Sequence, residues 1–116
     1  MKTEQLIYLA SPYTDDSAKI VNERYEATCK ITALLLSQGL YVYSPIVHGH
    51  CLIGYGLETD WENWKHFDKL MIDKSDIIYV LMIDGWNESI GVNAEIRYAI
   101  DLGMDVKYLD VNGEIQ

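Results

Sequence analysis

The sequence has little of what marks secreted, membrane-spanning or metal-clustered proteins. Its 116 residues include two cysteines and two prolines, and the longest unbroken apolar run, 77–83, is far shorter than the ~20 residues that span a bilayer. Cys29 and Cys51 have the spacing of neither a redox pair nor a zinc ribbon. No apolar targeting segment precedes the first strand pattern. We therefore expect a cytoplasmic protein with reduced thiols.

Positive charge is also scarce. Nine Lys and Arg residues face 18 Asp and Glu residues, so the formal net charge is −9. Such a charge repels the phosphates of a polynucleotide or an anionic membrane, and we expect neither as a partner. With 49% hydrophobic and 23% charged residues, the composition is typical of a globular protein, and the length predicts one domain over 1–116.

Apolar patterning predicts alternating strands and helices. Strands are expected where short apolar runs end at turn residues, and helices where apolar residues recur every three or four positions. The expected strands are 5–10, 41–43, 76–83 and 106–109, and the expected helices are 16–38, 59–74 and a third that ends at 102. This order predicts an α/β fold, a small doubly wound (flavodoxin- or Rossmann-like) parallel sheet of about four to five strands flanked by helices.

Two local features refine this prediction. Thr59 and Glu62 have the spacing of a capping box, which would start the second helix at Thr59. The segment 46–58, rich in His and Gly, is expected to be a long loop, and long loops in small domains are usually functional or mobile.

The ends of the predicted strands nominate a ligand site. In doubly wound sheets ligands bind beyond the carboxyl ends of the strands, here 11–13, 44–50 and 84–89. Gly54-Tyr55-Gly56 lacks the third glycine of a dinucleotide fingerprint, and no phosphate-binding Gly-Lys-Ser/Thr loop occurs. His48, His50, Cys51 and His66 do not match a zinc arrangement. We expect neither a metal nor a cofactor.

Two carboxylates fall on the apolar faces of their predicted helices. At about 100° per residue, Glu95 lies between Ala99 and Leu102, and Asp68 lies among Trp64, Met71 and other apolar side chains. A buried carboxylate costs several kcal/mol unless it has a partner or changes its pKa. One interpretation is that both residues are structural. Glu95 would then be an acidic residue near the N-terminus of its helix, and Asp68 would lie at the edge of the apolar face and reach solvent. The other is that the pair carries chemistry.

Four segments resemble a known superfamily. They are Leu6–Tyr13 (LIYLASPY), Tyr43–Ile46 (YSPI), Trp61–Trp64 (WENW) and Gly85–Glu95 (GWNESIGVNAE). Together they resemble a small branch of the nucleoside 2-deoxyribosyltransferase-like superfamily, which also contains deoxynucleoside 5′-monophosphate N-glycosidases. The resemblance extends over nearly the whole chain, and its most specific part is Ser89-x-Gly91-Val92-x-x-Glu95.

The resemblance implies roles for individual residues. Glu95 would attack the anomeric carbon of the sugar, Asp68 would assist the leaving base or orient the sugar, and Tyr8 would position the Glu95 carboxylate. Ser89 stands where the transferases often carry an aspartate for the free 5′-hydroxyl and the monophosphate hydrolases carry serine. Because a serine can donate a hydrogen bond to a phosphate, Ser89 favours a nucleoside 5′-monophosphate.

Further residues are expected to contact substrate. Trp61, Trp64 and Trp86 could each stack a base. Trp64 is assigned to the core, and Trp86, which follows a strand end, is the better stacking candidate. The Ser11–Tyr13 turn lacks the glycine-rich phosphate loop of the monophosphate hydrolases that it resembles, and Arg24, or Arg97 from a neighbouring subunit, could replace that loop. The predicted substrate-binding residues are Ser11, Pro12, Tyr13, Arg24, Ser44, His48, Trp86, Ser89 and Gly91.

Three functions remain open on sequence alone. The first is an N-glycosidase that hydrolyses a (deoxy)nucleoside 5′-monophosphate through a covalent glycosyl-glutamate, and the second is a nucleoside 2-deoxyribosyltransferase. The third is a non-catalytic nucleotide-binding module. The partner in each case is a small nucleoside or nucleotide. Because superfamily members complete their sites with a neighbouring chain, we expect a homodimer or larger homo-oligomer.

Overall fold

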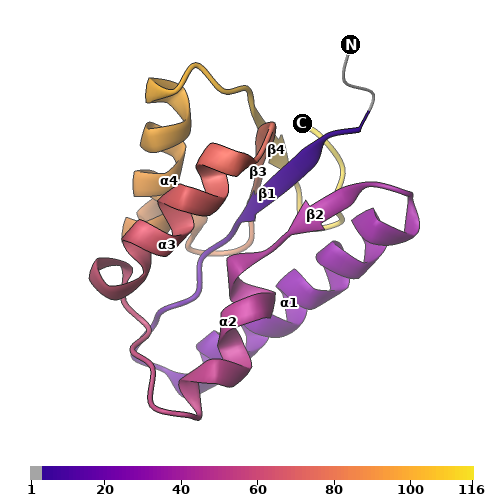
Figure 1. Ribbon diagram of the computed structural model, residues 1–116. Helices are drawn as coiled ribbons and strands as arrows, with labels where there is room; N and C mark the ends of the chain where they lie inside the picture. The colour runs from indigo at the N-terminus through magenta and orange to yellow at the C-terminus, as the bar shows by residue number, and fades with distance from the viewer. Residues whose placement is uncertain (1–3) are drawn as a thin grey trace.

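The computed structural model describes residues 4–116 as a four-stranded parallel sheet flanked by helices (Figure 1). The strands lie in the order β2-β1-β3-β4. Their bounds are Leu6–Ala10 for β1, Tyr41–Tyr43 for β2, Ile77–Leu81 for β3 and Val106–Leu109 for β4. The predicted doubly wound α/β fold is confirmed.

The sheet register follows from the apolar strands. Tyr8 of β1 pairs with Tyr43 of β2 on one side and with Ile78 of β3 on the other. Strand β2 follows β1 along the chain and lies on one side of it, whereas β3 lies on the other side. The order in which strands are added to the sheet therefore reverses between β1 and β3. In open α/β sheets, crevices for ligands form at the carboxyl ends of the strands at such a point.

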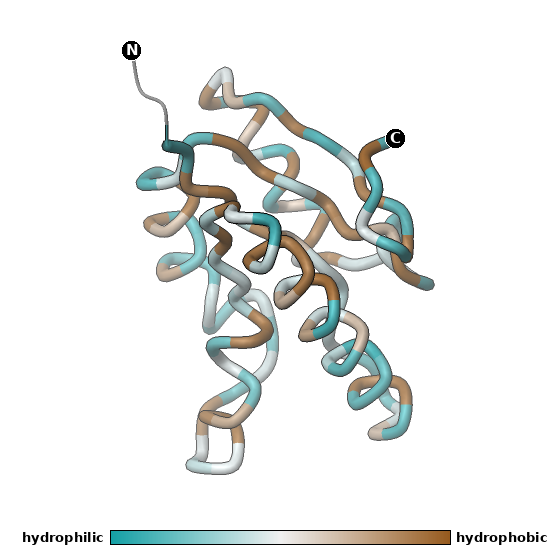
Figure 2. The backbone as a smooth tube through the Cα atoms, turned by 90° about the vertical axis from the view of Figure 1, so that its right-hand side faces the viewer, coloured by the Kyte–Doolittle hydropathy of each residue, from teal (hydrophilic) through white to brown (hydrophobic). Residues whose placement is uncertain are grey.

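Helices cover both faces of the sheet. The long helix α1 (Ala18–Ser37) packs Ile31 and Leu35 against one face. Helices α3 (Trp61–Lys74) and α4 (Ile90–Asp101) cover the other face. There Ile72 and Val92 pack in one core with strand residues that include Tyr8. Figure 2 shows the apolar strands running through the middle, with helices that alternate between polar and apolar residues.

The predicted loop 46–58 is wrong, because a helix, α2 (Pro45–Ile53), occupies most of it. The Ser44 hydroxyl accepts a hydrogen bond from the Val47 backbone N–H at 3.1 Å, and Pro45 occupies the first helical turn. Both residues favour a helix start, since proline needs no N–H there. Ser44-Pro45 therefore ends β2 and also begins α2.

The predicted capping box of α3 is also wrong. Asp60, not Thr59, caps the helix, and its carboxylate accepts a hydrogen bond from the Asn63 backbone N–H at 3.2 Å. A short 3₁₀ turn, η1 (Trp86–Glu88), follows β3, and Ser89 then caps α4 by accepting from the Val92 N–H at 3.2 Å. Ser89 and Asp60 thereby fix the helix starts that border the site.

Candidate active site

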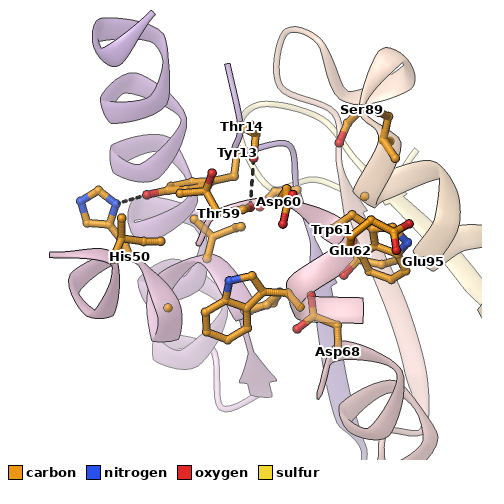
Figure 3. A pocket seen from close by; sticks show the side chains of 18 of the residues that line it. Tyr13, Thr14, His50, Thr59, Asp60, Trp61, Glu62, Asp68, Ser89 and Glu95 are labelled. Carbon is orange, nitrogen blue, oxygen red and sulfur yellow. Dashed lines mark hydrogen bonds between the residues drawn. The ribbon is translucent and has the colours of Figure 1, made fainter. Parts of the chain in front are cut away.

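A cavity of about 490 Å³ opens beyond the carboxyl end of β1 (Figure 3). Its wall comes from the β1–α1 loop, α2, the start of α3 and the start of α4. Figure 3 shows Tyr13 and His50 at one end, and Glu95 and Ser89 at the other. The location at the strand ends is the one that the sequence predicted.

Glu95 is the most deeply placed acidic residue of this wall. Its α4 side chain is only 4% exposed, and its carboxylate accepts a hydrogen bond from the Tyr8 hydroxyl of β1. Burial raises the pKa of Glu95 to about 8, the negative charge of Asp68 adds to the rise, and the Tyr8 hydrogen bond opposes it. Burial, with Glu95 next in importance, raises the pKa of Tyr8 well above its usual value, so this hydroxyl keeps its proton and donates.

Asp68 of α3 lines the same cavity. It is 7% exposed, and its Oδ1 atom is buried without a hydrogen-bond partner among the described residues. Burial raises the pKa of Asp68 to about 7. The prediction that Asp68 and Glu95 lie on the buried faces of their helices is confirmed, and each has the perturbed pKa typical of a carboxylate with a chemical role.

The pair can perform acid–base and nucleophilic chemistry. At neutral pH, burial and mutual repulsion favour a state in which the two groups carry fewer than two negative charges. With pKa values of about 7 for Asp68 and about 8 for Glu95, Asp68 is the first of the two to lose its proton. In the less populated state with the proton on Asp68, the Glu95 oxygen that Tyr8 orients can act as a nucleophile, and Asp68 can donate its proton. Enzymes that cleave glycosidic bonds commonly use two carboxyl groups with different surroundings, one as an acid and the other as a nucleophile or base.

Several of the expected binding residues border this cavity. Ser11, Tyr13, Ser89 and Gly91 all line it. The Ser11 hydroxyl accepts a hydrogen bond from the buried Thr28 hydroxyl at 3.2 Å, and Ser89 caps α4. Ser89, Ile90 and Gly91 bring the N-terminus of α4 to the cavity, and the first backbone N–H groups of a helix have no partner within the helix.

Other expected binding residues support the wall from behind. The side chain of Pro12 is buried, and the Ser44 hydroxyl caps α2 by accepting a hydrogen bond from the Val47 N–H. Arg24 donates from Nη1 to the Thr14 carbonyl at 2.9 Å and packs close to Gly85, whose φ is +88°. Arg24 therefore ties the β1–α1 loop to the turn after β3 and does not line the cavity.

His48 and Trp86 also lie outside the cavity lining. His48 is exposed, with Nδ1 3.3 Å from the Tyr43 hydroxyl and its ring stacked on Phe67. The Trp86 ring packs edge-on against Tyr108 and contacts the core. Their rings are turned toward protein neighbours by α2 and η1, and their contact with substrate stays a prediction.

Trp61 and Trp64 line the cavity, and Trp86 does not. The assignment of Trp64 to the core was therefore incomplete. His50 also lines the cavity, and its Nδ1 lies 2.7 Å from the Tyr13 hydroxyl. With α2 recognised, the four-residue spacing of Ile46 and His50 would have placed them on one side of the helix, and both line the cavity.

Among residues 4–116, no group of three His, Cys, Asp or Glu side chains is placed to hold a metal ion. No helix in the same range is long and apolar enough to cross a membrane.

Comparison with known proteins places the chain in a family. Residues 5–110 match the family described as a domain of unknown function, DUF1937. No curated protein matches the chain. A solved structure described as a 2-deoxyribosyltransferase from Bacillus psychrosaccharolyticus matches with a TM-score of 0.61 and 25% identity, over 96% of this chain and 76% of that chain. The chain therefore belongs to the DUF1937 family and has the fold of the nucleoside 2-deoxyribosyltransferase-like superfamily.

Proposed function

We propose that this protein cleaves the N-glycosidic bond of a nucleoside through a covalent intermediate on Glu95. The observation that carries the proposal is a buried Glu95 carboxylate that accepts a hydrogen bond from Tyr8 and faces the cavity that it shares with Asp68. The similarity to a solved structure described as a 2-deoxyribosyltransferase supports the same reaction class.

The proposed reaction has two steps. In the first, a Glu95 oxygen bonds to the anomeric carbon as the bond to the base nitrogen breaks, and a protonated Asp68 gives its proton to that nitrogen, so that the base leaves as a neutral molecule. In the second, water or another base attacks the same carbon and releases Glu95. Asp68 then takes the proton from the attacking group. Water as the acceptor gives a hydrolase, and a base gives a transferase.

The cavity also supports a choice of substrate. The N-terminus of α4 at Ser89 favours the nucleoside 5′-monophosphate expected from the sequence, because N–H groups and the helix dipole attract an anion. Against this, Glu88 lines the cavity beside Ser89, and among the described residues no Lys or Arg lines it. We therefore propose an unphosphorylated nucleoside as the preferred substrate, with the monophosphate as the second candidate.

We also propose that a second copy of the chain covers the cavity mouth. Ile90 lines the cavity and is 77% exposed, and Tyr55 beyond α2 is 89% exposed. Covering these apolar side chains would exclude water and stabilise the assembly.

The experiment compares base release by the wild type and by Glu95→Gln. Each protein is incubated with separate panels of nucleosides and their 5′-monophosphates, with and without an acceptor base, and free base is quantified by chromatography. Release by the wild type alone supports the proposal, and exchange that requires the acceptor identifies a transferase. Equal release by both proteins would refute the role of Glu95. Tight binding without turnover by either protein would support the non-catalytic nucleotide-binding module.

A further inference from the structure

The cavity wall carries an excess of negative charge. Five of its side chains end in a carboxyl group: Asp60, Glu62, Asp68, Glu88 and Glu95. Asp60 is engaged as the α3 cap, and Glu62 pairs with Lys65 at 2.7 Å. The lining residues in the described chain include no Lys or Arg that would balance the others.

Asp68 is the clearest case of a carboxylate in this wall without a compensating partner. The side chain is more than nine-tenths buried, its Oδ1 has no hydrogen-bond partner in the described chain, and Figure 3 shows the carboxylate directed into the cavity. A buried carboxylate oxygen without a partner is costly. Asp68 and Glu95 also repel each other, which contributes to the raised pKa of Glu95. A positive charge placed between them would relieve both penalties.

Aromatic rings complete the same wall. Tyr13, Trp61 and Trp64 line the cavity together with the carboxylates. Ring faces attract cations through their quadrupole, and rings combined with unbalanced carboxylates are the chemistry that recognises organic cations. The same carboxylates repel a phosphate, so they favour a cationic ligand over the monophosphate.

We propose that the preferred substrates are nucleosides whose base is already positively charged through a quaternised ring nitrogen, such as an N7-alkylated purine or a pyridinium. This inference rests on the proposed function. Glu95 attacks the anomeric carbon, the carbon–nitrogen bond breaks, and its electron pair neutralises the positive base. The base leaves without accepting a proton. Water then attacks the same carbon and replaces Glu95, and the proton of water passes to solvent. Until the carbon–nitrogen bond breaks, ionised Asp68 pairs with the cationic base.

The test measures binding, because cationic nucleosides also lose their base more easily without an enzyme. Calorimetry with Glu95→Gln compares 7-methylguanosine with guanosine, and 7-methyl-2′-deoxyguanosine with 2′-deoxyguanosine. We expect at least tenfold tighter binding of each cation. Adding Asp68→Asn should reduce the preference to less than threefold. Adding Asp101→Asn, an equal charge change at an exposed α4 position, should preserve it.

Equal affinity for the cationic and neutral members of each pair, or a preference that survives Asp68→Asn, would overturn the inference. Turnover assays of the wild type separate it from the proposed function. If the wild type cleaves neutral nucleosides but no cation preference exists, the proposed function stands and this inference fails. If cations bind through Asp68 but no nucleoside is cleaved, the inferred preference for cations holds and the proposed catalytic function is refuted. If no nucleoside binds or is cleaved, both fail.

Discussion

Glu95 combines a reactive carboxylate with a cost in stability. In the folded protein its pKa is about 8, against a usual value of 4.5. Between these two pH values the folded state holds a proton that the unfolded state has released. The free energy of unfolding contributed by this group therefore falls as pH rises from 4.5 to 8 and is constant above. A carboxylate kept in this environment stabilises the protein less than a neutral residue would.

Glu95→Gln should accordingly stabilise the protein. The amide oxygen can still accept the Tyr8 hydrogen bond, while the pH-dependent penalty disappears. We expect the variant to be more stable at pH 8 by on the order of 1–3 kcal/mol, and to show a shallower decline between pH 5 and 8. Urea unfolding across this range measures both. An unchanged pH slope would show that Glu95 is not buried as described.

Tyr8 lowers the pKa of Glu95 by donating a hydrogen bond to its carboxylate. In Tyr8→Phe that donor is absent, so less Glu95 is ionised at neutral pH. A hydrogen bond to a charged group is worth about 1.5–3 kcal/mol, and we expect kcat/KM to fall roughly 10–100-fold. The rising limb of the pH–rate profile should move to higher pH.

Tyr98→Phe is the matched control for this change, because the Tyr98 hydroxyl donates to Asp73 at 2.7 Å on the exposed surface. It should leave the profile unchanged. A rate loss in Tyr8→Phe without any shift of the profile would contradict the role assigned to the hydroxyl.

At the scale of elements, one arginine links the loops that form the cavity wall. Arg24 on α1 donates to the Thr14 carbonyl, and the Thr14 hydroxyl donates to the Thr59 carbonyl at 3.2 Å. A Cβ at Gly85 would lie 2.3 Å from Arg24 Nη2, and its φ of +88° also favours glycine. The turn after β3 thus leaves room for the side chain that holds the β1–α1 loop.

Gly85→Ala should displace Arg24 and loosen this loop. Because the guanidinium ends a flexible side chain, it can move away, and the loss is mainly its hydrogen bond to Thr14. We expect Gly85→Ala to cost about 1 kcal/mol more than Gly103→Ala, where φ is +76° but no atom lies within 4 Å of the added Cβ. Thermal unfolding of both variants measures the difference. In an Arg24→Ala background the two costs should converge, and a persistent difference would exclude Arg24 as the cause.

How much the sequence predicts depends on whether the signal is local. Continuous apolar strands and periodic helices predicted the sheet, and the helical faces of Asp68 and Glu95 predicted their burial. Helix α2 was missed because Gly49 and two histidines interrupt its apolar periodicity, although Ser44-Pro45 carries a helix start signal. The direction of Trp86 could not be predicted, because it depends on Tyr108 from β4, which is distant in the chain.

At the scale of the whole molecule, the open cavity mouth favours association. With Ile90 and Tyr55 exposed by 77% and 89%, we expect light scattering to give at least twice the 13.3 kDa of one chain. Ile90→Glu should shift the population toward the single chain and reduce activity at low protein concentration. Full activity of a 13.3 kDa species would contradict the proposal that a second copy completes the site.

The most direct test of the central claim is the mass of the protein during reaction. A nucleoside with fluorine at the 2′ position destabilises the positively charged transition states of both steps, and a reactive leaving base keeps the first step accessible. After acid quenching, peptide mass spectrometry should find one fluorosugar on the peptide that contains Glu95, and none in Glu95→Gln. Base release by the wild type without any adduct, or an adduct on another residue, would contradict the covalent role of Glu95.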